Sequence, residues 1–301
     1  MRNRILLPLL AAVAATVLAG CGGDPLDEDG GDPAASGTVR VGSANFTENI
    51  VLAEIYAQAL DGAGVQTETD LNVGTRERYL PALEEGELDL VPEYTGALLV
   101  YLDEEATVSS SDEVYAALQD ALPEGLTALE PAEAEDKDAL VVTEETAAEF
   151  DLSSIEDLAA VDDQLVLGGP PEFQERVQGV PGLERVYGIE FSDFRELDTG
   201  TLSVTGLQDG DVDVANIFTT NPAIEENGFV VLEDPENLFS AQQVVPVINS
   251  DKVTDTVEQT LNDVSAALTT EGLTALNRRV DVDKENPDDV AADWLEENGL
   301  L

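Results

Sequence analysis

The side chains that most often carry catalysis or bind metals are nearly absent from this sequence. Its 301 residues include no histidine and a single cysteine, Cys21. Without histidine, a Ser-His-Asp triad, a zinc site with histidine ligands and an imidazole general base are all excluded. Carboxylates remain, but 64 Asp and Glu residues supply a pair at any spacing, so no glycosidase-type pair is indicated. We therefore expect no enzymatic activity, no metal site and no cofactor.

Cys21 ends an N-terminal segment that has the pattern of an export signal. Arg2 and Arg4 precede an apolar run that is too short to anchor stably in a bilayer. The run ends in Leu18-Ala19-Gly20-Cys21, which resembles a bacterial lipobox, where the cysteine thiol receives a diacylglyceryl group. We expect residues 1–20 to be a lipoprotein signal peptide and Cys21 to anchor the protein outside the cell membrane. The alternative is an ordinary signal peptide, or an N-terminal helix with an incidental cysteine.

The composition is that of a folded but strongly acidic protein. Hydrophobic residues make up 43%, while 64 acidic against 13 basic residues give a formal net charge of -51. Such a surface repels nucleic acids and anionic lipid headgroups, so we expect no nucleic-acid partner. The acidity fits solubility in a saline setting, with attraction of cationic solutes as a secondary effect.

The first half of the chain alternates between strand-like and helix-like patterns. Residues 21–37 are rich in Gly, Asp and Pro and predict a flexible tether. Strands are then expected at 39–42, 65–71 and 88–91, with helices from Thr47 to about Gly62 and over 76–85. This order predicts a parallel sheet with helices on both faces, whose ligands bind beyond the carboxyl ends of the strands. Those ends are residues 43–47 and 92–96.

A second series of elements follows from residue 139. We expect two α/β lobes with a cleft between them and a helical tail, without an internal sequence repeat. The tail, residues 254–300, predicts three amphipathic helices interrupted at Gly272 and Pro287. The remaining expected elements are strands at 139–142, 164–168, 192–197, 212–218 and 244–248 and helices at 153–158 and 201–207.

Several collinear segments resemble the binding proteins of the glycine betaine/carnitine/choline/proline ABC importers, of the OpuC and ProX type. They agree in order and spacing over nearly the whole predicted mature chain, which makes the resemblance specific. The segments are 42–49 (GSANFTEN), 88–96 (LDLVPEYTG), 169–173 (GPPEF) with 182–183 (GL), 207–220, and 280–282 (VDV).

This resemblance implies a type II periplasmic-binding-protein fold, an α/β architecture of two lobes that close on a solute. The chain would cross twice, so that residues 38–137 and 246–301 form one lobe and residues 138–245 the other. The strand pattern by itself places breaks near Asp136 and Pro246. The resemblance also implies a monomeric receptor that delivers its solute to a membrane permease and its cytoplasmic ATPase.

The resemblance further implies residues that hold the cationic end of a ligand. In the family an aromatic cage holds a quaternary ammonium group, because a methylated cation has no N–H to donate and is attracted to ring faces. Tyr94 matches one cage position, and the other positions fall at Asp138, Phe218 and Gln242. A full charge at Asp138 would suit a primary or secondary ammonium, a guanidinium or a choline-like cation. Gln242 could bond an amide or hydroxyl.

The other end of the ligand is expected to meet Arg176, which matches a family arginine that contacts the ligand's carboxylate. Ser43, Asn45 and Thr47 lie at the predicted start of a helix, where exposed N–H groups also bind ligands. Other interpretations stay open: Arg176 pairing with the acidic surface, Asn45 and Thr47 capping the helix, and Tyr94 and Phe218 as core aromatics.

Taken together, these features predict an extracytoplasmic solute-binding protein for a compatible solute of the glycine betaine, choline, carnitine or proline class, with a role in osmoprotection. One alternative is a protein of the same fold that binds another small cationic or zwitterionic solute, such as an amino acid or a guanidinium compound. A second is a lipoprotein that senses solute for a partner. An enzyme on this fold would lack any plausible catalytic constellation.

Overall fold

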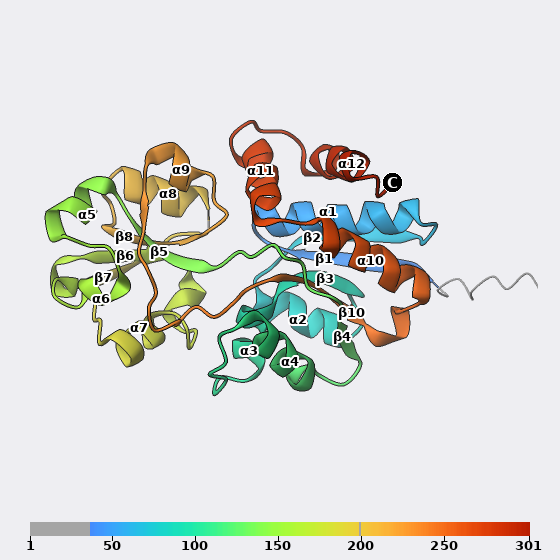
Figure 1. Cartoon of the computed structure of the whole chain (residues 1–301), viewed down its shortest axis with the longest axis horizontal. Coiled ribbons are helices and arrows are strands. Elements are labelled where there is room, and N and C mark those ends of the chain that lie inside the picture. Colours follow the sequence, from blue (N-terminus) through green and yellow to red (C-terminus); the bar gives the residue numbers. More distant parts are fainter. Residues whose placement is uncertain (1–36, 199) are drawn as a thin grey trace, which may run out of the picture. The chain divides into compact units, whose positions relative to one another are not determined.

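The structure is a computed structural model that describes residues 37–198 and 200–301 (Figure 1). The expected signal peptide, Cys21 and the tether up to residue 36 lie outside the described residues. The described chain forms two five-stranded sheets, each with its own helices.

The first sheet has the strand order β2-β1-β3-β10-β4. Strands β1, β2 and β3 are parallel, as predicted, whereas β10 runs antiparallel to both β3 and β4 because the chain enters it on returning from the second sheet. The strands are β1 (Val39–Ala44), β2 (Thr67–Gly74), β3 (Leu90–Tyr94), β4 (Leu126–Ala128) and β10 (Val244–Asn249). Its helices are α1 (Thr47–Gly62), α2 (Arg76–Glu84), α3 (Thr95–Leu102) and α4 (Ser111–Ala121).

The second sheet repeats this arrangement, with the order β7-β6-β8-β5-β9. Strands β6, β7 and β8 are parallel, and β5 is antiparallel to β8 and β9. The strands are β5 (Asp138–Val142), β6 (Val166–Gly169), β7 (Asp193–Glu196), β8 (Val214–Phe218) and β9 (Val230–Val231). The helices are α5 (Glu144–Phe150), α6 (Ile155–Leu158), α7 (Val180–Tyr187), α8 (Thr201–Gln208) and α9 (Ala223–Asn227), with short 3-10 turns at 162–164 and 171–174; a further one at 250–252 follows β10 of the first sheet.

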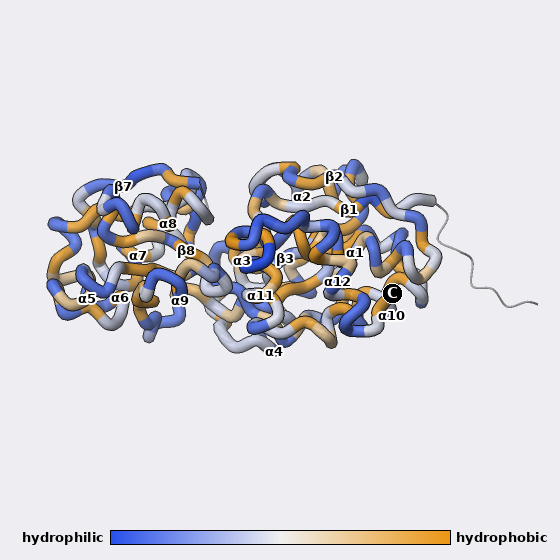
Figure 2. Tube along the Cα trace, turned by 90° about the horizontal axis from the view of Figure 1, so that it is seen from above, coloured by the Kyte–Doolittle hydropathy of each residue, from blue (hydrophilic) through white to orange (hydrophobic). Residues whose placement is uncertain are grey.

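Both faces of each sheet are buried. Two apolar clusters pack on the first sheet and two on the second. Helix α1 contributes the fully buried Leu52, Ile55, Tyr56 and Leu60 to one of them. Figure 2 shows hydrophobic residues in the sheets and helices of both halves of the chain. Each half therefore has an apolar core of its own, as expected for a chain of this length.

Some predicted strand boundaries are wrong by two or three residues. Strand β3 begins at Leu90 rather than at residue 88; just before it, the Asp89 carboxylate accepts a hydrogen bond from the Arg40 backbone N–H (2.9 Å). Strand β2 begins at Thr67 rather than at residue 65, and Gln164 belongs to a 3-10 turn rather than to β6.

The chain crosses between the sheets twice, and the two crossings are joined to each other. Glu135 in the first crossing forms a β-bridge with Gln243 in the second, and the Asp136 N–H donates to the Gln242 carbonyl (3.1 Å). The second crossing also lies tightly against α3, since a Cβ atom at Gly96 would lie 2.4 Å from the Ala241 carbonyl oxygen. Strand β10 starts at Val244, two residues before the lobe boundary expected at residue 246.

The C-terminal segment contains three helices, as predicted: α10 (Asp255–Ala267), α11 (Thr270–Asp281) and α12 (Pro287–Asn298). Pro287 begins α12, but the predicted interruption at Gly272 is wrong, because Gly272 lies within the first turn of α11. The Thr269 hydroxyl accepts a hydrogen bond from the Gly272 N–H (3.1 Å) and caps that helix. The cap satisfies an N–H group that the first turn leaves unpaired.

We expect Thr269→Ala to lower the free energy of unfolding by about 1 kcal/mol, because the first turn of α11 loses its cap. Urea denaturation followed by circular dichroism measures this change. The matched control is Thr269→Ser, which keeps the hydroxyl and should lie within about 0.5 kcal/mol of the wild type. Equal losses in both variants would contradict the cap as the cause.

Candidate ligand-binding site

A cleft that opens to solvent lies between residues of the two sheets. It is lined by Ala44, Asn45, Phe46, Thr75, Arg76, Tyr79, Tyr94, Ala97, Asp136, Asp138, Pro170, Glu172, Phe173, Arg176, Phe218 and Gln242.

Six of the eight predicted ligand-binding residues line this cleft: Asn45, Tyr94, Asp138, Arg176, Phe218 and Gln242. Tyr94 is the last residue of β3 and Phe218 the last of β8, so both project from carboxyl ends of parallel strands. Asp138 begins β5 directly opposite Phe218 in the antiparallel register. The fold thus brings together residues that are far apart in the sequence.

Ser43 and Thr47 do not line the cleft. Ser43 is fully buried, where its hydroxyl donates to the Ala44 carbonyl (3.0 Å) and accepts from the Asn72 N–H (2.8 Å). Thr47 is the first residue of α1 rather than its cap, and its hydroxyl donates to Asp281 (2.7 Å). It faces a second, polar pocket beside the cleft. Both side chains are therefore occupied by structural contacts.

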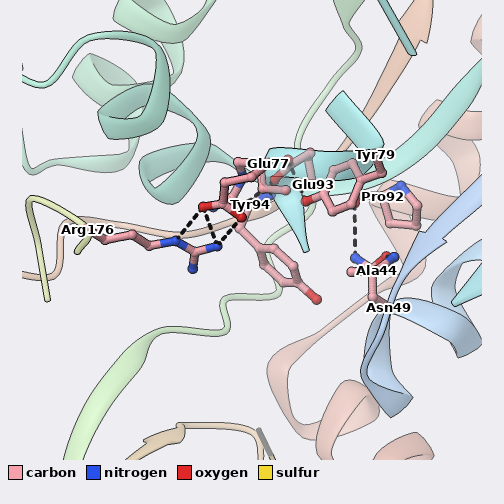
Figure 3. A network of polar contacts seen from close by, with 9 residues as sticks. Ala44, Asn49, Glu77, Tyr79, Pro92, Glu93, Tyr94 and Arg176 are labelled. Carbon is pink, nitrogen blue, oxygen red and sulfur yellow. Dashed lines mark hydrogen bonds and ion pairs between the residues drawn. The ribbon is translucent and has the colours of Figure 1, made fainter. Parts of the chain in front are cut away.

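Asn49 fixes the edge of the first sheet from which the cleft opens (Figure 3). Its carboxamide oxygen accepts from the Ala44 N–H (2.7 Å), and its NH2 group donates to the Pro92 carbonyl (3.0 Å). Because Ala44 ends β1 and Pro92 lies in β3, this buried side chain ties the two strands together at the cleft. These two hydrogen bonds position the end of β3, where Tyr94 lies.

Phe46 is an aromatic residue of the cleft that the sequence analysis missed. Its ring lies between Tyr94 and Phe218, with centroid distances of 6.1 and 5.3 Å and interplanar angles of 30° and 49°. Phe46 lies within the segment 42–49 that carried the family resemblance, but only Ser43, Asn45 and Thr47 of that segment were predicted to bind the ligand. Phe46, Tyr94 and Phe218 therefore form a group of neighbouring rings, and Tyr79 and Phe173 also line the cleft.

Arg76 lines the cleft but is already paired. Its Nε and Nη2 donate to the two carboxylate oxygens of Glu93 (2.8 Å each), and the Tyr79 hydroxyl also donates to Glu93 (2.7 Å), as Figure 3 shows in part. All three side chains are buried. Burial by itself would lower the pKa of Arg76, but the carboxylate of Glu93 outweighs it and raises the pKa, so the guanidinium stays charged.

Arg176 is also paired, with Glu77 of α2 (Figure 3). Its Nε and Nη2 donate to the two carboxylate oxygens of Glu77 at 3.1 and 3.2 Å. Burial would raise the pKa of Glu77, but hydrogen bonds from Arg176 and Thr75 outweigh it and lower this pKa to about 2. The pair joins the first sheet's half of the chain to the second sheet's half.

Two buried carboxyl groups lie close to the rings: Asp136 lines the cleft, and Glu48 lines the adjoining polar pocket. Glu48 accepts hydrogen bonds from the Tyr94 hydroxyl (2.8 Å), the Thr220 hydroxyl (2.6 Å) and the Asn277 NH2 group (2.6 Å). Asp136 accepts from the Thr220 N–H (3.1 Å). Burial raises the pKa of both carboxyls, and the neighbouring charge of Glu48 raises that of Asp136 further. No sequence pattern distinguishes these two residues from the rest of the 64 acidic residues.

The chemistry of the cleft favours a cation. Five aromatic side chains and the carboxyl groups of Asp136, Asp138 and Glu172 line it, while both lining arginines are neutralised by paired carboxylates. Among residues 37–198 and 200–301, no cluster of His, Cys, Asp or Glu side chains is arranged to hold a metal ion. In the same residues, no helix combines the length and apolar character needed to span a membrane.

The two sheets and their cleft define a type II periplasmic-binding-protein fold, and solved structures confirm this class. A glycine betaine/carnitine/choline ABC transporter structure aligns with a TM-score of 0.71 at 21% identity, covering 87% of this chain and 99% of that one. Apo YehZ from Escherichia coli aligns with a TM-score of 0.62 at 26% identity, covering 88% and 99%.

The chain belongs to the family described as the substrate binding domain of ABC-type glycine betaine transport systems, which it matches over residues 37–297. A glycine-betaine-binding protein of Pseudomonas aeruginosa is 30% identical, with 99% of this chain and 96% of the relative aligned. The glycine betaine-binding protein YehZ of Escherichia coli K12 is 28% identical over 88% of this chain and 92% of its own length.

Proposed function

We propose that this protein is the extracytoplasmic receptor of an ABC importer and binds a compatible solute of the glycine betaine, choline, carnitine or proline class. The observation that supports this most is the convergence of Tyr94, Phe46 and Phe218 with the Asp138 carboxylate on one cleft. A ring face attracts a desolvated ammonium by about 0.5–2 kcal/mol. Three rings and an anion together form a site for a small organic cation.

We propose that the two halves of the chain act as lobes, residues 38–137 with 246–301 and residues 138–245, that close on this solute. Family membership supports delivery of the solute to a permease and its ATPase. Lipid at Cys21 would hold a monomeric receptor at the outer side of the cell membrane. Asn45 and Gln242, which also line the cleft, would bond polar groups of the solute.

Isothermal titration calorimetry with glycine betaine, choline, carnitine, proline and arginine tests this function. We expect saturable binding of at least one of these solutes at micromolar concentrations. Arginine also tests the alternative that the acidic cleft takes a guanidinium compound. If a folded sample binds none of the five, the proposed solute class is wrong.

Phe46→Leu is expected to weaken binding of the preferred solute by about 2- to 30-fold, because leucine keeps apolar contact but lacks a ring face. Calorimetry measures the change in Kd. Phe229→Leu is the matched control, since Phe229 packs on the second sheet away from the cleft and should leave Kd unchanged. Equal affinities of the Phe46 variant and the wild type would show that this ring does not contact the solute.

A further inference from the structure

The pair of Arg176 and Glu77 lies where the cleft meets a second pocket outside it. Arg176 lines both spaces, and Glu77 lines the outer one. The side chain of Arg176 is 21% exposed and that of Glu77 is 41% exposed, so the pair stands at the rim in partial contact with solvent. Of the two arginines that line the cleft, Arg176 is the one with a partly exposed side chain.

The geometry of this pair restricts what Arg176 can offer a ligand. Two parallel N–H donors on one side of the guanidinium are bound to the two oxygens of Glu77. Such a two-point arrangement is the strongest way in which arginine binds a carboxylate. A ligand carboxylate would have to displace Glu77 or share a guanidinium whose charge is already matched.

No other lining cation compensates for this. Arg76, the second arginine of the cleft, is buried in its own two-point pair with Glu93. Asp138 and Glu172 also line the cleft and repel an anion. A carboxylate entering the cleft would therefore lose its hydration without gaining an unpaired positive charge, which is unfavourable.

We propose that Glu77 is a specificity-determining residue: by holding Arg176, it makes the cleft prefer cations without a carboxylate, such as choline, over zwitterions such as glycine betaine. This inference rests on the proposed function. Glu77 acts through Arg176 and does not itself touch the solute. Its effect should therefore appear in the ratio of two affinities, because an unpaired Arg176 attracts a carboxylate and repels a cation.

The test compares choline and glycine betaine by calorimetry in the wild type, Glu77→Gln and Glu104→Gln. Glutamine removes the charge of Glu77 and frees the Arg176 guanidinium for a ligand carboxylate. Glu104 lines the same outer pocket and forms no hydrogen bond or ion pair through its side chain among the described residues, so its replacement controls for the loss of one negative charge. Glu77→Ala serves as a second variant if glutamine destabilises α2.

We expect the wild type to bind choline at least about tenfold more tightly than glycine betaine, which is the effect of one charge-assisted hydrogen bond. Glu77→Gln should tighten glycine betaine binding about tenfold and leave choline binding unchanged or weaker, while Glu104→Gln keeps the wild-type ratio. An unchanged ratio in both Glu77 variants, or a wild type that prefers glycine betaine, overturns the inference alone. If neither these two solutes nor carnitine, proline or arginine binds, the proposed function fails with it.

Discussion

Arg76→Met is expected to lower the free energy of unfolding by about 3–5 kcal/mol. The substitution leaves the carboxylate of Glu93 buried without its guanidinium, although the Tyr79 hydroxyl still donates to it. The penalty arises from an uncompensated buried charge, because methionine fills much of the space that the arginine occupied. Urea denaturation at neutral pH, followed by circular dichroism, measures the loss.

Arg78 provides the matched control for this prediction, since it lies two residues further along α2 with an exposed side chain. Arg78→Met should change the free energy of unfolding by less than about 0.5 kcal/mol. Adding Glu93→Gln to Arg76→Met should restore part of the stability, because the unpaired charge disappears. A loss below about 1 kcal/mol in Arg76→Met would contradict a buried charge pair.

Asp136→Asn is expected to stabilise the protein relative to the wild type, and to do so more strongly as the pH rises. Below pH about 4, Asp136 is protonated in both the folded and unfolded states and adds no pH dependence. Burial and the charge of Glu48 raise its folded pKa, so at higher pH the unfolded chain releases a proton that the folded protein retains. The wild type then loses up to about 1.4 kcal/mol per pH unit until the folded pKa is passed.

Asparagine mimics the protonated acid: its oxygen can accept from the Thr220 N–H and its NH2 group can donate to Glu48. Denaturation curves between pH 4 and 8 give the difference between variant and wild type. Glu87→Gln, which replaces an exposed acid, should show no such trend. A difference that stays constant or shrinks with rising pH would show that Asp136 is not held in its protonated form.

Local sequence patterns predicted most of the elements that build the two sheets. Alternation of apolar residues and capping signals located β1, α1, α2, β5, β8 and β10 within a few residues. Some elements without such signals were missed, since α3 is so apolar that it has no polar face and β9 has only two residues; α4 and α7 were also missed although both carry helix signals. The antiparallel direction of β10 depends on the route of the chain between sheets, which local periodicity does not contain.

Prediction of the site was limited for a different physical reason. The family resemblance located Tyr94, Asp138 and Phe218, which the structure places on one cleft. The resemblance could not show that the Glu77 carboxylate binds the Arg176 guanidinium, because the two residues are 99 positions apart in the sequence. Glu48 and Asp136 could not be singled out among the many acidic residues, because residue type alone does not reveal which carboxyl groups the folded chain buries.

The hydrogen bonds that join the two crossings restrict how the second sheet can rotate against the first. Asp136 and Gln242 are bonded to each other, and Thr95 and Gly96 hold Gln243 and Ala241 against the start of α3. A rotation of the second sheet must therefore pivot close to these residues. Asp138 and Gln242, which line the cleft, lie next to this pivot. In the proposed closure, a solute bound beside this pivot needs to shift the two sheets only slightly to move the distant edge of the second sheet much further.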